Sequence, residues 1–119
     1  MSWLSVCLTG LYCAFGYSVA GLRSAWRDDR PFRQEVVVLI AAVAAALWLG
    51  ESGTERALLI GSWLLVIVVE LINSAIESTV NRIGLERHEL SGRAKDLASA
   101  SVFCSIVLAV IVWLAVLTG

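Results

Sequence analysis

The amino-acid sequence predicts an all-α membrane protein with three transmembrane helices and an N-terminal amphipathic helix that lies in the membrane interface. Hydrophobic residues make up 59% of the 119 residues, and the mean hydropathy is +0.83. Soluble domains are only about 45 to 50% apolar. Long apolar segments alternate with short regions that hold most of the basic residues, as expected for membrane spans and their loops. The composition therefore excludes a small soluble domain.

The first element, residues 1–30, is expected to form the interfacial helix. Its first 22 residues carry no charged side chain, so a signal peptide and a fourth span are the alternatives. A signal peptide needs a basic start and a small-residue cleavage site, and neither is convincing here. Gly10, Gly16 and Gly21 weaken a spanning helix. Aromatic residues favour the interface instead: Trp3, Tyr12, Tyr17 and Trp26.

Three membrane helices are expected at about residues 32–49, 57–80 and 95–117, so that residues 1–119 form one integral-membrane domain. Pro31 precedes the first of them, and proline favours the first turn of a helix. The segment Gly50-Glu51-Ser52-Gly53 has the composition of a tight turn, and residues 82–95 form a polar connection. The three cysteines fit no metal-binding spacing and are interpreted as free packing thiols: Cys7, Cys13 and Cys104.

The positions of the basic residues predict the orientation in the membrane. Four arginines precede the first span, and four basic residues lie in the long connection between the second and third spans: Arg23, Arg27, Arg30 and Arg33, then Arg82, Arg87, Arg93 and Lys95. The connection between the first two spans offers only Arg56. By the positive-inside rule, the N-terminus is cytoplasmic and the C-terminus periplasmic. Trp48 and Trp113 fall at the outer interface.

The second span carries Glu70, Asn73 and Glu77 at spacings of three and four residues, which places all three side chains on one helix face. A charge at the centre of a bilayer costs about 2.5 to 3.5 kcal/mol on insertion scales. Pairing with a neighbouring helix is one explanation, and chemistry is the favoured one. Glu77 lies about 10 Å nearer the cytoplasm, where a hydrated cation can reach it. Glu70 lies deeper, where desolvation makes a carboxylate a stronger proton acceptor.

Further charges lie on the cytoplasmic side of the membrane. Lys95 suits phosphate, and Asp96 can hold that amine or bind a hard metal ion. Asp28 or Asp29 could join Glu77 on magnesium. Each residue also has a structural interpretation, as a topology determinant, a surface charge or a helix cap. No glycine-rich phosphate loop is present, so side chains and metal must hold any nucleotide, and the five tryptophans suit interfacial anchors better than nucleic-acid binding.

These residues resemble the motifs of the small prokaryotic diacylglycerol kinases, over about residues 10–117. The matching segments include Gly21-Leu22-Arg23-x-Ala25-Trp26, Phe32-Arg33-Gln34-Glu35, Glu70-x-x-Asn73-Ser74-Ala75-Ile76-Glu77, His88-Glu89-Leu90 and Ala94-Lys95-Asp96-x-x-Ser99. The resemblance implies an inner-membrane homotrimer with active sites shared between subunits. It also implies transfer of the γ-phosphate of MgATP to diacylglycerol, which gives phosphatidic acid.

The resemblance implies a role for particular residues. Glu70 is the expected catalytic base, and Asp29 and Glu77 are the expected magnesium ligands. The expected nucleotide contacts are Tyr17, Asp29, Asn73, Glu77, Glu86, Arg87, His88, Lys95 and Asp96. The expected contacts to the lipid substrate are Arg23, Trp26, Arg33, Glu35, Trp48, Arg56, Glu70, Ser99 and Trp113.

Some positions depart from the family pattern. Gly10 and Cys13 stand where the family usually has basic residues, Asn81 replaces an aspartate, and Asp29 is shorter than the usual glutamate. A weakly active member is therefore one alternative. The related undecaprenol kinase, which shares the core motif and differs in its lipid acceptor, is another. A small transporter that uses an intramembrane glutamate is an alternative of another class, although it leaves Lys95-Asp96 and Asp29 unexplained.

Overall fold

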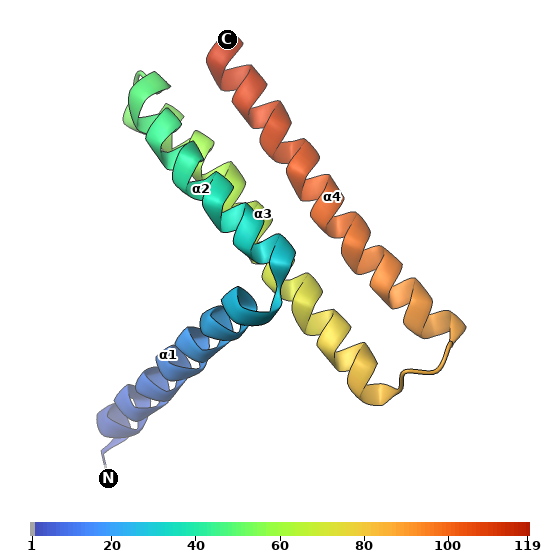
Figure 1. The fold of residues 1–119 in the computed structure, drawn as a ribbon. Helices are drawn as coiled ribbons and strands as arrows, with labels where there is room; N and C mark the ends of the chain where they lie inside the picture. Colours follow the sequence, from blue (N-terminus) through green and yellow to red (C-terminus); the bar gives the residue numbers. More distant parts are fainter. Residues whose placement is uncertain (1) are drawn as a thin grey trace.

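A computed structural model of the protein describes residues 2–119, which form four α-helices (Figure 1). These are α1 (Trp3–Asp28), α2 (Arg30–Leu49), α3 (Gly53–Ile83) and α4 (Glu89–Thr118). The prediction of an all-helical protein is confirmed. A polar residue precedes each helix, and its side chain accepts a hydrogen bond from a backbone N–H of the first turn: Ser2, Asp29, Ser52 and His88.

The helix starts differ from the expected spans because caps, rather than hydropathy, decide where a helix begins. α3 begins at Gly53, directly after its Ser52 cap, and continues to Ile83. α4 begins at Glu89, six residues before the expected start at residue 95, because His88 caps it. Its first two turns are therefore polar helix outside the apolar span.

The turn between α2 and α3 requires a glycine. A Cβ atom at Gly50 would lie 2.5 Å from Arg56 Cγ and 2.7 Å from the backbone oxygen of Ala46. Both contacts are shorter than any real Cβ contact, and the second one involves backbone that closes the end of α2. The absence of a side chain at Gly50 therefore lets α3 fold back beside α2.

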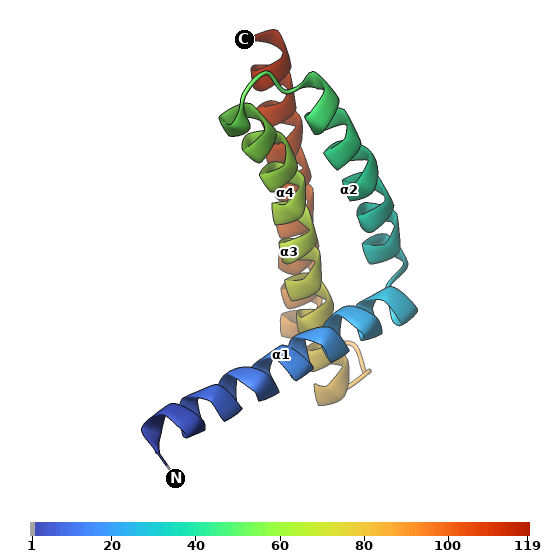
Figure 2. The same cartoon turned by 90° about the vertical axis from the view of Figure 1, so that its left-hand side faces the viewer.

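α3 is the central helix of the molecule, since it packs against both α2 and α4. These three helices run side by side, and α1 crosses them at one end, with its N-terminus pointing away (Figures 1 and 2). α1 contacts α2 at the corner where the two helices meet. The single chain is correspondingly extended, at 49 × 46 × 23 Å.

The buried core is thin. Its main cluster joins Ala25 of α1, Phe32 of α2 and Ile67 of α3, with Trp63 packed against it. Most large apolar side chains are exposed, including those of Phe103 and of many leucines and valines. Such an apolar surface needs lipid or other protein to cover it. The chain is therefore a membrane protein.

All four helices have the length and hydropathy needed to cross a membrane, and α1 is among them. The crosswise direction of α1 sets it apart from the other three helices (Figure 2). Ala25 is its one buried residue. The assignment of α1 to the interface stays a prediction.

Candidate active site

An open cleft of about 1260 Å³ lies where the C-terminal end of α1 and the start of α2 meet the second half of α3. α4 supplies one further wall, which includes Ser99. The polar residues that line the cleft are Ser18, Ser24, Asp28, Asp29, Arg30, Glu35, Glu70, Asn73, Ser74, Glu77, Ser78, Asn81 and Ser99. The cleft thus gathers residues from Ser18 to Ile106, which are 88 positions apart in the chain, around one end of the helical bundle.

Glu70 and Glu77 both line this cleft, as their common helix face predicts. Glu70 is only 4% exposed, whereas Glu77 is exposed. Their difference in membrane depth stays a prediction. Asn73 lies between them and is half-buried. The site therefore offers one desolvated carboxyl group and one open to water and ions.

Asp29 connects two elements of the cleft. Its Oδ1 accepts a hydrogen bond of 3.2 Å from the backbone N–H of Phe32, which caps α2. Its Oδ2 accepts a hydrogen bond from the Ser74 hydroxyl of α3. A carboxylate has about four acceptor positions, so each oxygen of Asp29 retains capacity for a cation.

Three acidic groups, Asp29, Glu35 and Glu70, lie close enough to interact electrostatically. Glu35 is 8% exposed, and its Oε2 atom is buried without a hydrogen-bond partner. No arginine or lysine forms an ion pair with these three groups within residues 2–119. Buried polar atoms are nearly always satisfied in native proteins, so this cluster is suited to bind a ligand that carries protons or positive charge.

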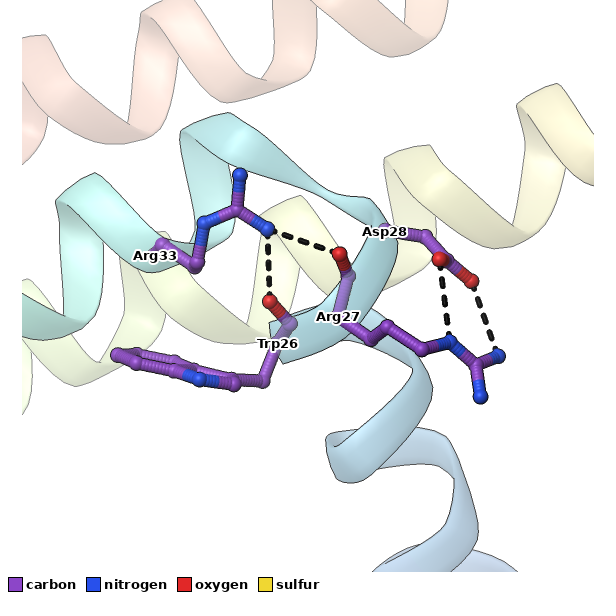
Figure 3. A network of polar contacts seen from close by, with 4 residues as sticks. All are labelled: Trp26, Arg27, Asp28 and Arg33. Atoms are coloured by element: carbon purple, nitrogen blue, oxygen red, sulfur yellow. Dashed lines mark hydrogen bonds and ion pairs between the residues drawn. The ribbon is translucent and has the colours of Figure 1, made fainter.

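A second polar network lies at the corner between α1 and α2 (Figure 3). Arg27 Nε and Nη2 each donate to Asp28 at 3.1 Å, and this hydrogen bonding lowers the pKa of the exposed Asp28 carboxyl. Arg33 Nη1 donates to the backbone oxygens of Trp26 at 2.8 Å and of Arg27 at 2.9 Å. Arg33 therefore satisfies carbonyls that the end of α1 leaves free, a role that the sequence did not predict.

A smaller hollow of about 450 Å³ lies at the start of α4 and is lined by Arg87, His88, Glu89, Gly92, Arg93 and Asp96. His88 Nδ1 accepts the backbone N–H of Leu90 at 3.1 Å, so this imidazole also caps α4. Glu86 lies beside Gly84. Neither Glu86 nor Lys95 lines either cavity.

The expected nucleotide contacts are thus divided within the chain. Asp29, Asn73 and Glu77 line the large cleft. Arg87, His88 and Asp96 line the smaller hollow. Tyr17 is exposed on α1, outside both. A single chain does not bring these residues together.

The expected lipid contacts are also divided. Glu35, Glu70 and Ser99 line the cleft. Arg23, Trp26 and Arg33 belong to the α1–α2 corner and do not line the cleft. The third group, Trp48, Arg56 and Trp113, lies at the other end of the bundle, where the Trp113 indole donates to the backbone oxygen of Leu59 at 3.0 Å.

No group of three or more histidine, cysteine, aspartate or glutamate side chains forms a ready metal cage within residues 2–119. Asp29 and Glu77 nevertheless line one cleft. Magnesium is commonly held by one or two carboxylates together with substrate phosphates. The two carboxylates therefore fit magnesium that arrives with a nucleotide.

Ser74 and Ser78 line the cleft although the sequence did not single out either as a site residue. Their signal was helical spacing, because Ser74 lies four residues after Glu70 and Ser78 lies eight after it. Asn81 lines the cleft too and forms part of its wall. Serine is common in apolar helices for packing reasons, which makes it a weak signal alone.

The family model and the relatives that this chain matches all point to one family. Residues 16–117 match the family described as prokaryotic diacylglycerol kinase. The chain is 53% identical over 105 residues to a diacylglycerol kinase of Escherichia coli (strain K12), which covers 88% of this chain and 86% of the relative. It is 48% identical over 106 residues to a diacylglycerol kinase of Haemophilus influenzae, covering 89% and 90%. It is 45% identical over 106 residues to one of Pseudomonas aeruginosa, covering 89% and 86%. The chain therefore belongs to the prokaryotic diacylglycerol kinase family.

Proposed function

We propose that the protein is an inner-membrane kinase that transfers the γ-phosphate of ATP to the free hydroxyl of diacylglycerol and produces phosphatidic acid. Family membership supports kinase activity on this lipid. The observation that carries the proposal is the buried Glu70 in an open cleft that Asp29 and Glu77 also line. One cleft thus offers a proton acceptor and ligands for a charged co-substrate.

Glu70 acts as the general base. Its carboxylate takes the proton of the lipid hydroxyl while the hydroxyl oxygen forms a bond to the γ-phosphorus. The bond between that phosphorus and the oxygen bridging to the β-phosphate breaks, and ADP leaves with that oxygen. Because phosphoryl transfer depends mainly on positioning and charge, the principal task of Glu70 is to orient the hydroxyl.

Asp29 and Glu77 hold the magnesium that accompanies ATP. Magnesium, when bound, neutralises charge on the transferred phosphoryl group. Ser74 keeps the Asp29 carboxylate facing the cleft through the hydrogen bond to Oδ2. The exposure of Glu77 supports its role, since a hydrated ion must reach this carboxylate.

The active protein is a homotrimer whose sites are shared between subunits. The division of the expected nucleotide contacts between two hollows of one chain supports sharing. A second chain that brings its Arg87, His88 and Asp96 to the large cleft would complete the nucleotide site. The extensive exposed apolar surface is consistent with helix packing between subunits and with lipid contact.

Residues 1–119 act as one membrane domain in which α1 lies at the cytoplasmic interface and α2, α3 and α4 cross the bilayer. This arrangement makes the N-terminus cytoplasmic and the C-terminus periplasmic, in accordance with the basic residues. The cleft then opens at the cytoplasmic surface. ATP can then reach the cleft from the cytoplasm, and the lipid substrate can reach it from the membrane.

The test is phosphate transfer by purified protein in mixed micelles that contain labelled ATP, magnesium and either diacylglycerol or undecaprenol. We expect labelled phosphatidic acid, and we expect chelation of magnesium to stop transfer reversibly. Preferential labelling of undecaprenol would show that undecaprenol, and not diacylglycerol, is the lipid acceptor. Transfer to neither lipid would refute the proposed kinase activity. The alternative of a small transporter would then be tested by transport assays in vesicles.

A further inference from the structure

Trp63 makes one of two side-chain hydrogen bonds that join α3 to α2 or its cap within residues 2–119. Its indole N–H donates to the backbone oxygen of Glu35 at 2.8 Å, across 28 positions of the chain. The second bond is that of Ser74 with Asp29. The two bonds lie on opposite sides of Glu70 along α3.

The residue that Trp63 contacts, Glu35, is one of the two buried acids of the cleft. Glu35 is more than nine-tenths buried, and its Oε2 atom has no hydrogen-bond partner. A buried carboxylate without partners cannot correct its position through alternative hydrogen bonds of its own. Its location relative to Glu70 therefore depends on where the backbone of α2 lies against α3.

Trp63 has the surroundings needed to fix that backbone. It packs against the cluster of Ala25, Phe32 and Ile67, which belong to α1, α2 and α3. It lies seven residues, or two helical turns, before Glu70 and thus on the same face of α3. One side chain therefore joins the apolar core to the backbone of Glu35.

We propose that Trp63 is a positioning residue for phosphoryl transfer, because its indole N–H sets the place of the Glu35 carboxylate beside Glu70. This inference rests on the proposed kinase function. Trp63 does not line the cleft and touches no substrate there. It acts through the α2 backbone, and its loss leaves Glu35 free to shift. Small displacements of positioning groups cost large factors in rate.

The test compares Trp63→Phe with the parent in wild-type and Glu35→Gln backgrounds. Phenylalanine keeps an aromatic ring and removes the donor. We expect the turnover number with diacylglycerol to fall about tenfold, with the KM for ATP and the thermal unfolding midpoint in micelles nearly unchanged. In the Glu35→Gln background, followed at high protein concentration, we expect Trp63→Phe to have almost no further effect.

The double mutant separates positioning from general support. Glu35→Gln keeps the backbone oxygen that accepts the indole N–H, so a purely structural contribution of Trp63 would persist in that background. Trp113→Phe is the matched control, since it removes an inter-helix indole bond to Leu59. Trp113→Phe should change the turnover number by the same factor in the wild-type and Glu35→Gln backgrounds.

A second variant tests the N–H alone if Trp63→Phe perturbs folding. Incorporation of benzothienylalanine at position 63 keeps the shape of the side chain and replaces the indole N–H by sulfur, and it should give the same loss of turnover. Full turnover in either folded variant, or equal losses with and without Glu35, would overturn the inference alone. A wild-type protein that transfers phosphate to no lipid would overturn this inference together with the proposed function.

Discussion

Glu70 bears a desolvation cost that no ion pair within residues 2–119 offsets. The ion pair formed within residues 2–119 joins Arg27 to Asp28 on the exposed corner. Glu70 instead lies near Asp29 and Glu35, which carry the same charge. Within residues 2–119, Glu70 therefore has no basic side chain with which to pair. A buried acid among acids is better explained by a ligand or a proton that arrives during catalysis.

Replacing Glu70 by glutamine should abolish turnover, because the amide cannot take a proton. We expect at least a hundredfold loss, the usual scale of general base catalysis, while ATP binding measured by calorimetry stays intact. Glu51→Gln makes the same chemical change at an exposed turn outside the cleft and should leave turnover unchanged. Normal turnover of Glu70→Gln would show that another group is the base.

Replacing Glu77 by glutamine should act mainly on nucleotide binding, since its exposed carboxylate is the proposed magnesium ligand. We expect the KM for MgATP to rise about tenfold, with a smaller change in the turnover number, which is the pattern of lost binding in the ground state. Excess magnesium should partly restore the rate. Kinetics at several magnesium concentrations check this, and an unchanged KM at all of them argues against the assignment.

Local backbone chemistry decides where each helix begins and how neighbouring helices meet. Asp29 illustrates the point, because it caps α2 and also joins α3 through Ser74. The shorter aspartate is well suited to a cap, since Asp is among the favoured N-cap residues. Asp29 therefore has a structural role at the start of α2.

The α2–α3 turn gives a prediction for stability. Gly50→Ala brings a methyl group against Arg56 and the backbone oxygen of Ala46, and overpacking of this kind costs about 1 to 3 kcal/mol. We expect a lower unfolding midpoint in micelles by circular dichroism. Gly53 is the first residue of α3, and a Cβ there meets nothing within 4 Å, so Gly53→Ala should change the midpoint little. Equal midpoints for both variants would show that the turn relaxes without cost.

A single chain of this protein is too thin to enclose both substrates. α3 has neighbours on two sides, whereas α1 crosses the bundle and leaves most of its surface open (Figure 2). The large cleft and the hollow at the start of α4 hold different parts of the expected nucleotide site. Assembly of several chains is the simplest way to unite them, since oligomers usually close by symmetry.

Mixing inactive subunits tests shared sites. Glu70→Gln lacks the base and Asp96→Asn alters the nucleotide hollow, so each should be nearly inactive alone. If the two residues act from different chains, co-assembly in equal amounts should restore activity in about a quarter of the sites, because each intact half is present in half of the subunits. Co-assembly of the Glu70→Gln/Asp96→Asn double variant with itself is the control. No recovery from well-mixed trimers would place both residues in the same chain's site.

The helical class, the membrane environment, and the shared face of Glu70 and Glu77 could all be predicted from the sequence. These follow from composition and helical spacing, which are local properties of the chain. Capping extended α3 and α4 beyond the apolar spans. The Ser52 cap was readable from the sequence, whereas histidine is not among the favoured N-cap residues. The family motifs also pointed to most of the acids that line the cleft.

The contacts between residues distant in the chain could not be predicted from the sequence and come from the packing of the helices. It brought Ser74 to Asp29 and the Trp63 indole to Glu35, and it gave Arg33 the carbonyls at the end of α1. It also separated the expected nucleotide contacts into two hollows. Hydropathy and spacing describe one helix at a time, whereas these contacts depend on the direction in which α1 leaves α2 and on how closely α2 approaches α3.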